Sequence, residues 1–66
     1  MDMDLLQMKI DKSGLKQVYL AEQLGISRFG FAEKLKYPER WKVAEATKMI
    51  RLLNLSKAES KQIFGL

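Results

Sequence analysis

Hydrophobic and polar positions along this chain follow a helical rather than a strand periodicity. Apolar residues recur three and four positions apart in five segments, which Gly, Pro, Asn or Ser residues separate. We expect helices over about 3–13, 16–24, 28–36 and 43–53, and a fifth that follows Ser56. No segment alternates strictly between apolar and polar residues. The pattern therefore predicts an all-α fold, with residues 1–66 forming a single domain.

Helix-capping and helix-breaking residues define the ends of these helices. Gly14 is expected to end the first helix, and Asn54 to end the fourth in a left-handed conformation. A loop is expected at 37–40, because the residue before a proline disfavours helical backbone. Ser56 and Glu59 have the spacing of a capping box, in which each side chain binds the backbone N–H of the other residue.

The apolar faces of the helices predict the core. Met8 and Met49 are expected to fill gaps, and Trp41 to plug one end of the domain. Near the C-terminus, Ile63, Phe64 and Leu66 either close the core or form a dimer contact. The remaining expected core positions are Met3, Leu6, Ile10, Leu20, Leu24, Phe31, Leu35, Ala46, Ile50 and Leu53.

Residues 17–35 carry the most informative spacing in the chain. Ala21 is small where two helices would touch, and Gly25 falls where the first of them ends, a position that often needs a positive φ. Ile26 then turns back into the core, and Ser27 is a good N-cap for the next helix. This order predicts a helix-turn-helix, a motif that lays its second helix in the major groove of DNA.

The same stretch resembles the lambda-type phage repressor and Cro family, most closely a Cro-like phage subgroup in which residues 41–64 supply two closing helices. The resemblance implies a compact five-helix lambda-repressor-like domain. It also implies a regulator from a phage or mobile element in a bacterium, one that occupies an operator and blocks RNA polymerase. Operators of this family are commonly palindromic, so the expected partner is double-stranded DNA bound by a homodimer, which forms on the DNA or beforehand. The residues that carry the resemblance are Gln17, Leu20, Ala21, Leu24, Gly25, Ile26, Ser27 and Phe31.

Charge placement supports a polyanionic partner. Residues 1–27 hold three Lys against four acidic residues, whereas residues 28–66 hold nine Lys or Arg against four acidic residues. A basic region of this kind is the electrostatic footprint of nucleic acid, although a solvated surface is the simpler explanation of charge alone.

Composition excludes several other classes of protein. The chain has no Cys and no His, which removes disulfides, the usual zinc sites and imidazole catalysis. Acidic residues are scattered and no Gly-rich phosphate loop is present, so we expect neither an enzyme nor a cofactor or metal site. No apolar run approaches the ~20 residues that span a bilayer. We expect a cytoplasmic protein in a bacterial host cell, with no membrane partner.

Four residues at the start of the 28–36 helix are the expected base contacts. Arg28 can donate two hydrogen bonds to guanine, and Glu33 can accept one from cytosine unless it pairs with a nearby Lys. Phe29 has three open alternatives, namely a thymine methyl group, a protein partner, or the edge of the core. Ala32 lies further along the same face, and Gly30 either permits a close approach of DNA or is simply tolerated.

A second set of residues is expected to contact phosphates. Through the resemblance, Gln17 matches the family position that anchors to a phosphate, although Lys16 replaces the Thr or Ser that commonly caps this helix. The basic side chains among these residues would supply affinity and salt dependence without reading sequence. The expected phosphate contacts are Gln17, Ser27, Lys34, Lys36, Tyr37, Arg40 and Lys42, of which the basic ones cannot all face one surface.

A second function fits the same fold. Phe29 and Gly30 on the proposed recognition helix are unusual for a DNA reader, and they suit a protein-binding module that docks on another regulator.

Overall fold

The computed structural model describes all 66 residues, and helices are its only regular secondary structure. No strand occurs, so the all-α prediction and the number of α-helices are confirmed. A short 3₁₀ turn, η1 (Pro38–Arg40), lies between the third and fourth helices. The α-helices are α1 (Met3–Ser13), α2 (Gln17–Leu24), α3 (Arg28–Lys36), α4 (Val43–Leu52) and α5 (Lys57–Phe64).

Glycines end the first two helices in the expected way. Gly14 follows α1 with φ 75°, and Gly25 follows α2 with φ 71°. At the end of α2, the Gly25 N–H donates to the Glu22 carbonyl and the Ile26 N–H to the Ala21 carbonyl, both at 3.0 Å. These two bonds satisfy carbonyls that the end of a helix otherwise leaves free. The connection between α2 and α3 therefore needs only residues 25–27.

The caps of the later helices also agree with the sequence. Asn54 takes a left-handed φ of 52° after α4. Ser56 Oγ accepts the Glu59 N–H at 3.1 Å, and Glu59 Oε1 accepts the Ser56 N–H at 2.8 Å, which completes the capping box. Ser27 Oγ caps α3 by accepting the Gly30 N–H at 3.0 Å. Each of these devices acts over a few residues, which is why the sequence reveals them.

The segment 37–40 is more ordered than the predicted loop. Pro38 opens a 3₁₀ turn, in which the Trp41 N–H donates to the Pro38 carbonyl at 3.2 Å. The fixed φ of proline suits the first position of a helical turn, where its missing N–H is not needed. Helix α2 begins at Gln17 and helix α4 ends at Leu52, each one residue inside its predicted bound.

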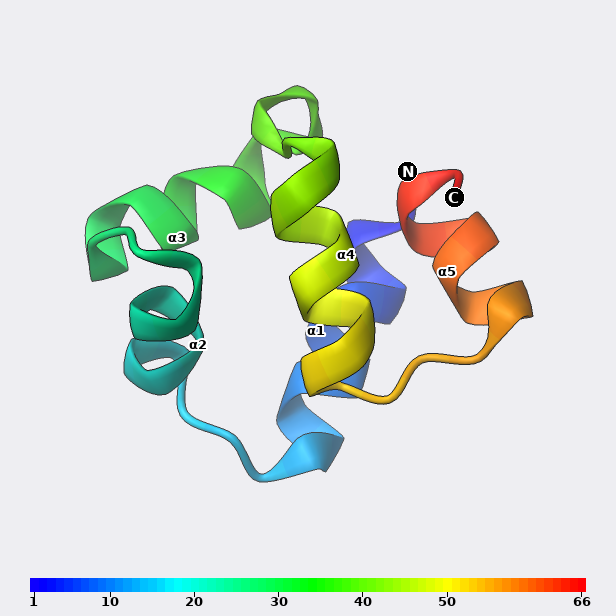
Figure 1. Cartoon of the computed structure of the whole chain (residues 1–66), viewed down its shortest axis with the longest axis horizontal. Coiled ribbons are helices and arrows are strands. Elements are labelled where there is room, and N and C mark those ends of the chain that lie inside the picture. Colours follow the sequence, from blue (N-terminus) through cyan, green and yellow to red (C-terminus); the bar gives the residue numbers. More distant parts are fainter.

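The helices divide into two sides around α4. Figure 1 shows α2 and α3 on one side, α4 crossing the middle in front of α1, and α5 on the other side with both chain termini. Gln62 on α5 donates to the Asp2 carboxylate at 2.8 Å, which ties the C-terminal helix to the start of α1. The radius of gyration is 10.5 Å, close to the roughly 11 Å expected for a globule of this length.

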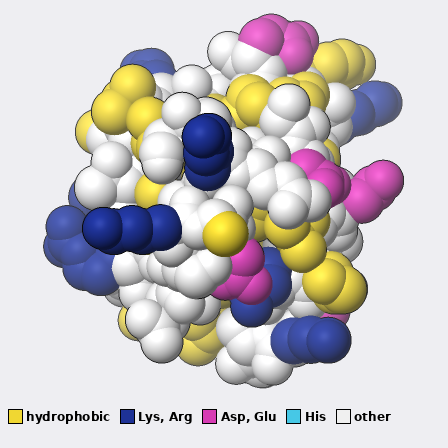
Figure 2. All heavy atoms as spheres, turned by 90° about the vertical axis from the view of Figure 1, so that its right-hand side faces the viewer, with side chains coloured by type: hydrophobic (Ala, Val, Ile, Leu, Met, Phe, Trp, Pro, Cys, Tyr) yellow, Lys and Arg dark blue, Asp and Glu magenta, His cyan; other side chains and the backbone are white.

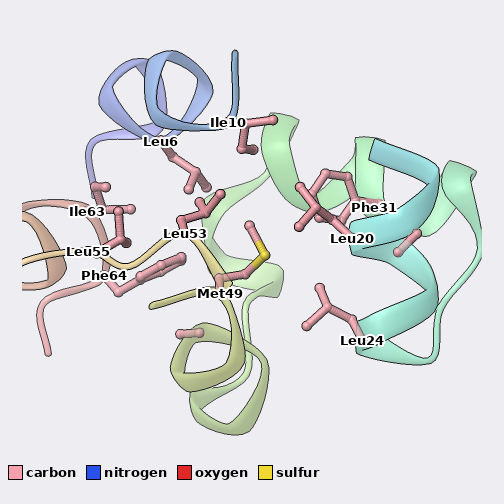
Figure 3. Close-up of a cluster of buried hydrophobic side chains, with 12 residues drawn as sticks. Leu6, Ile10, Leu20, Leu24, Phe31, Met49, Leu53, Leu55, Ile63 and Phe64 are labelled. Atoms are coloured by element: carbon pink, nitrogen blue, oxygen red, sulfur yellow. The ribbon is translucent and has the colours of Figure 1, made fainter. Parts of the chain in front are cut away.

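All five helices contribute to one hydrophobic core. Met49 of α4 is fully buried between the side chains of α1 and α5 and those of α2 and α3 (Figure 3). Ile63 and Phe64 belong to this core, whereas Leu66 is 51% exposed, so the C-terminal apolar residues mainly close the domain. Met8 was predicted to fill a gap, but it is exposed, because it lies on the side of α1 away from Leu6 and Ile10. The buried members are Leu6, Ile10, Leu20, Ala21, Leu24, Phe31, Ala46, Met49, Leu53, Leu55, Ile63 and Phe64.

Trp41 packs against the core as predicted. Its ring meets Phe31 edge-on at 6.2 Å between centroids and Phe64 at 5.1 Å. Edge-to-face contacts at these distances contribute a favourable free energy in addition to that from the burial of apolar surface. Trp41 thus joins α3 to α5 through the segment that precedes α4.

Two alanine substitutions test the role of backbone conformation. We expect Gly25→Ala to lower the free energy of unfolding by about 1 kcal/mol, because an L-residue is strained at positive φ even in open space. Gly30→Ala is the matched control within helix α3. Its Cβ would meet Ser27 Oγ at an ordinary 3.4 Å, so we expect stabilisation of up to ~1 kcal/mol. Urea unfolding followed by circular dichroism measures both, and equal effects would contradict this account.

Candidate functional site

The first two turns of α3 present an outward face. Arg28, Phe29 and Ala32 are exposed there and Glu33 is half-buried, while Phe31 on the opposite side of the helix is fully buried. Positions 28 and 32, and likewise 29 and 33, are four residues apart and therefore neighbours on the helix surface. The structure thus brings together the four side chains that the sequence predicted as base contacts.

Arg28 and Glu33 have no internal electrostatic partner. The only ion pairs of the structure are Lys9–Glu59 and Lys34–Glu45, both at 2.8 Å. The alternative in which Glu33 pairs with a nearby Lys is therefore not the one that the structure adopts. The free guanidinium leaves hydrogen-bond donors open to a ligand on this helix face, and the free carboxylate leaves acceptors open.

Phe29 is the most exposed large hydrophobic side chain, at 74%. The alternative in which its ring folds over the edge of the core is therefore wrong, since position 29 projects away from buried Phe31. Burying a phenylalanine side chain of this kind is worth roughly 1.5–3 kcal/mol. Any ligand that covers Phe29 gains part of that free energy.

A cluster of aromatic and basic side chains lies at the far end of α3. Lys36 Nζ is 5.6 Å from the centre of the Tyr37 ring, and Arg40 Cζ is 5.3 Å from it. Cations within about 6 Å of a ring face are attracted to its electrons. All three residues are exposed, and neither cation has a carboxylate partner. Residues 36, 37 and 40, which we call the basic turn, therefore offer two positive charges and a phenol hydroxyl on one surface.

Lys34 occupies a different place from the one predicted. Its side chain is buried, and Nζ bonds Glu45 Oε1 at 2.8 Å and the Arg40 carbonyl at 2.9 Å. The ammonium is therefore already satisfied within the protein and does not face the surface that Lys36 and Arg40 share. The sequence carries a signal for this placement, because position 34 is three residues from Phe31 and hence on the buried side of the helix.

The residues at the starts of α2 and α3 remain accessible. Gln17 is exposed at the first position of α2, where Lys16 makes no side-chain cap, so the first N–H groups of this helix are open to an acceptor. Ser27 Oγ accepts the Gly30 N–H, but its own O–H proton is still available to a phosphate oxygen. Lys42 is also exposed, immediately after Trp41.

The opposite side of the molecule has a different character. Figure 2 shows the face formed by α5 and the termini, on which acidic and basic side chains lie among hydrophobic ones. Helix α5 also carries exposed basic residues, Lys57 and Lys61. They provide charge-matched controls for any test of the α3 side.

The Lys34–Glu45 pair affects the ionisation of Glu45. Burial raises the pKa of the Glu45 carboxyl. The Lys34 ammonium and the Lys42 backbone N–H lower it by more than burial raises it, so the pKa lies below its ordinary value. A carboxyl whose pKa is lowered by folding stabilises the protein above the ordinary pKa, and this contribution is lost as pH falls through the folded pKa. The pKa of Asp2 is also lowered, mainly because its carboxylate accepts the Leu5 N–H, and the pKa of Glu59 is lowered mainly by its bond to the Lys9 ammonium.

Lys34→Met tests this account. At pH 7 we expect it to lower the free energy of unfolding by about 3 kcal/mol, because it leaves a buried carboxylate without its cation. At a pH below the lowered pKa of Glu45, the difference from the wild type is expected to shrink, because Glu45 is then protonated in both proteins. Chemical unfolding at both pH values measures this, with exposed Lys36→Met as the control. A difference that does not depend on pH would contradict the assignment.

Comparisons with known proteins add no relative. No protein-family model, no curated protein and no solved structure matches this chain. No helix has the length and apolar character needed to cross a membrane. No three His, Cys, Asp or Glu side chains are grouped so that they would hold a metal ion. The geometry of the α3 side is therefore the basis for a functional assignment.

Proposed function

We propose that this protein is a sequence-specific double-stranded DNA-binding transcriptional regulator of the Cro-like repressor type. In this proposal α2, residues 25–27 and α3 act as a helix-turn-helix, and α3 enters the major groove. The observation that carries it is the outward face of α3, where Arg28 and Glu33 lack internal partners. At roughly 1.5 Å per residue, α3 is long enough to follow a groove that is about 12 Å wide.

The exposed residues divide into two roles in such a complex. Arg28 would donate two hydrogen bonds to guanine, Glu33 would accept one from cytosine, and Phe29 and Ala32 would meet apolar base edges. Phosphates would be held by the basic turn at one end of α3, by Ser27 at the other end, and by the start of α2. This phosphate set consists of Gln17, Ser27, Lys36, Tyr37, Arg40 and Lys42, without Lys34.

Repression would follow from occupancy alone. A bound domain would cover an operator and exclude RNA polymerase, which requires neither an effector nor catalysis. Two copies on a palindromic operator would place their α3 helices in successive major grooves, about 34 Å apart. The protein would act in a bacterial cytoplasm and would originate from a phage or mobile element.

Fluorescence anisotropy with duplex DNA tests the proposal. We expect tighter binding to the intergenic DNA beside the protein's own gene than to a random duplex. The logarithm of affinity should fall linearly with the logarithm of salt concentration, with a slope of about −0.9 for each phosphate contacted. Lys36→Ala combined with Arg40→Ala should reduce that slope by about 1.8. Lys57→Ala combined with Lys61→Ala removes the same charge from α5 and should change it little.

Two results would contradict the DNA-binding proposal. Weak binding that is equal for both duplexes, or equal loss of affinity in the two double variants, would mean that net charge and not the α3 side attracts DNA. Arg28→Ala adds a second criterion. It should reduce affinity about tenfold for the native duplex and much less for the random one, as expected for one base contact.

The exposure of Phe29 favours a second candidate function. A ring that is 74% exposed suits a protein-binding module, because accessible aromatic side chains are typical anchors of protein interfaces. In that case affinity for the partner would respond weakly to salt, since an apolar contact releases no counterions. The two functions therefore differ in salt dependence as well as in ligand.

Removal of thymine methyl groups distinguishes the two roles of Phe29. In a selected high-affinity duplex, replacing a contacted thymine by uracil should weaken wild-type binding about fourfold, the value of one buried methyl group. Phe29→Ala should bind more weakly and no longer distinguish thymine from uracil. Anisotropy titrations of four combinations of protein and DNA measure this coupling. If every thymine tested has the same effect in both proteins, Phe29 does not meet a methyl group.

A further inference from the structure

One buried ammonium joins α3 to the start of α4. Lys34 Nζ contacts the Arg40 carbonyl at 2.9 Å and Glu45 Oε1 at 2.8 Å, and it lies 5.9 Å from the centre of the Trp41 ring. Glu45 Oε1 in turn accepts the Lys42 N–H at 3.0 Å. Every partner of the ammonium therefore belongs to the segment 40–45, which begins at the last residue of η1.

A contribution to folding stability does not by itself explain this buried ion pair. The two side chains are only 11% and 13% exposed, and removing two charges from water has a cost that their attraction often fails to exceed. Position 34 also lies beside Phe31 and Trp41, where an apolar side chain would pack. One role found for some buried ion pairs is to hold a geometry that apolar contacts would leave free to vary.

The geometry held here joins two parts of the proposed DNA interface. The outward face of α3 carries Arg28 and Phe29, while Arg40 and Lys42 lie on the segment that Lys34 holds. A duplex can be bound by both parts at once only if their spacing matches the distance from the groove to the flanking phosphates. A segment free to move would lose this spacing, although each side chain would remain exposed.

We propose that Lys34 and Glu45 are positioning residues, which fix the segment 40–45 against α3 so that base and phosphate contacts form together. This inference rests on the proposed DNA-binding function. Neither residue touches DNA in the proposal. Their contribution passes through the backbone of Arg40 and Lys42, which the ion pair holds directly.

The double variant Lys34→Met with Glu45→Gln tests this role. The introduced glutamine keeps an acceptor for the Lys42 N–H, and the variant leaves net charge unchanged. We expect a urea midpoint near that of the wild type, but about tenfold weaker binding to the native duplex, as for the loss of one charge-assisted hydrogen bond. The salt slope should decrease by about 0.9 for each phosphate that the variant no longer binds. A purely structural role would not change this slope in a folded variant.

The chain provides a closely matched control. Lys9 and Glu59 also form a 2.8 Å pair, and Glu59 also accepts the N–H of its own helix cap, from Ser56. Lys9→Met with Glu59→Gln repeats the chemistry on α1 and α5, away from α3. We expect its affinity and salt slope to equal those of the wild type.

The outcomes separate the inference from the function on which it rests. If the wild type and the Lys9–Glu59 control bind no duplex specifically, the DNA-binding proposal fails. If both bind and the folded Lys34–Glu45 variant binds with the same affinity and slope, the positioning role is overturned. Should that variant not fold, Lys34→Gln with Glu45→Gln, which keeps a donor for the Arg40 carbonyl, is judged by the same two criteria.

Discussion

The contacts around Trp41 connect the two sides of this small domain. Its ring meets Phe31 of α3 and Phe64 of α5, and the Lys34 ammonium lies near its face. A chain of 66 residues buries few side chains, so a ring that contacts two helices contributes to the packing of both. Without this ring, α3 and α5 would have no shared aromatic contact, and the segment before α4 would lose its apolar anchor. The indole N–H is buried and has no acceptor within the protein, so the contacts of the ring are those with the two phenylalanines and the Lys34 ammonium.

The two ion pairs of the protein show how the same chemistry differs with burial. Lys9–Glu59 and Lys34–Glu45 have equal lengths, and each glutamate also accepts the N–H of a helix cap. Side chains of the first pair are more than a quarter exposed, so solvent weakens their attraction and the pair contributes little to stability. The second pair is enclosed and holds a backbone carbonyl as well, so losing either partner leaves an uncompensated buried group.

The α3 side combines features that suit a nucleic-acid ligand. Its outward face has a free guanidinium and a free carboxylate, and two cations flank an exposed phenol at the end of the helix. Phe29 is the exception, because its exposed ring would suit either a thymine methyl group or an apolar protein surface. The proposed functions therefore share one surface and differ in the ligand that covers Phe29. This is also why salt dependence is the most informative property to measure.

The sequence by itself determined the five α-helices and most of their ends. Gly14, Gly25, Asn54, Ser27 and the Ser56–Glu59 box each act on backbone groups a few residues away, so their effects can be read without knowing the fold. Periodicity likewise identified most of the core and the outward face of α3, because a helix repeats its faces regularly. The tertiary structure alone decided which partner each long side chain meets. Lys34 pairs with Glu45 across eleven positions, no other part of the protein covers Phe29, and Ile63 and Phe64 turn into the core. These outcomes depend on how the helices pack against one another, and no local pattern of residues specifies that arrangement.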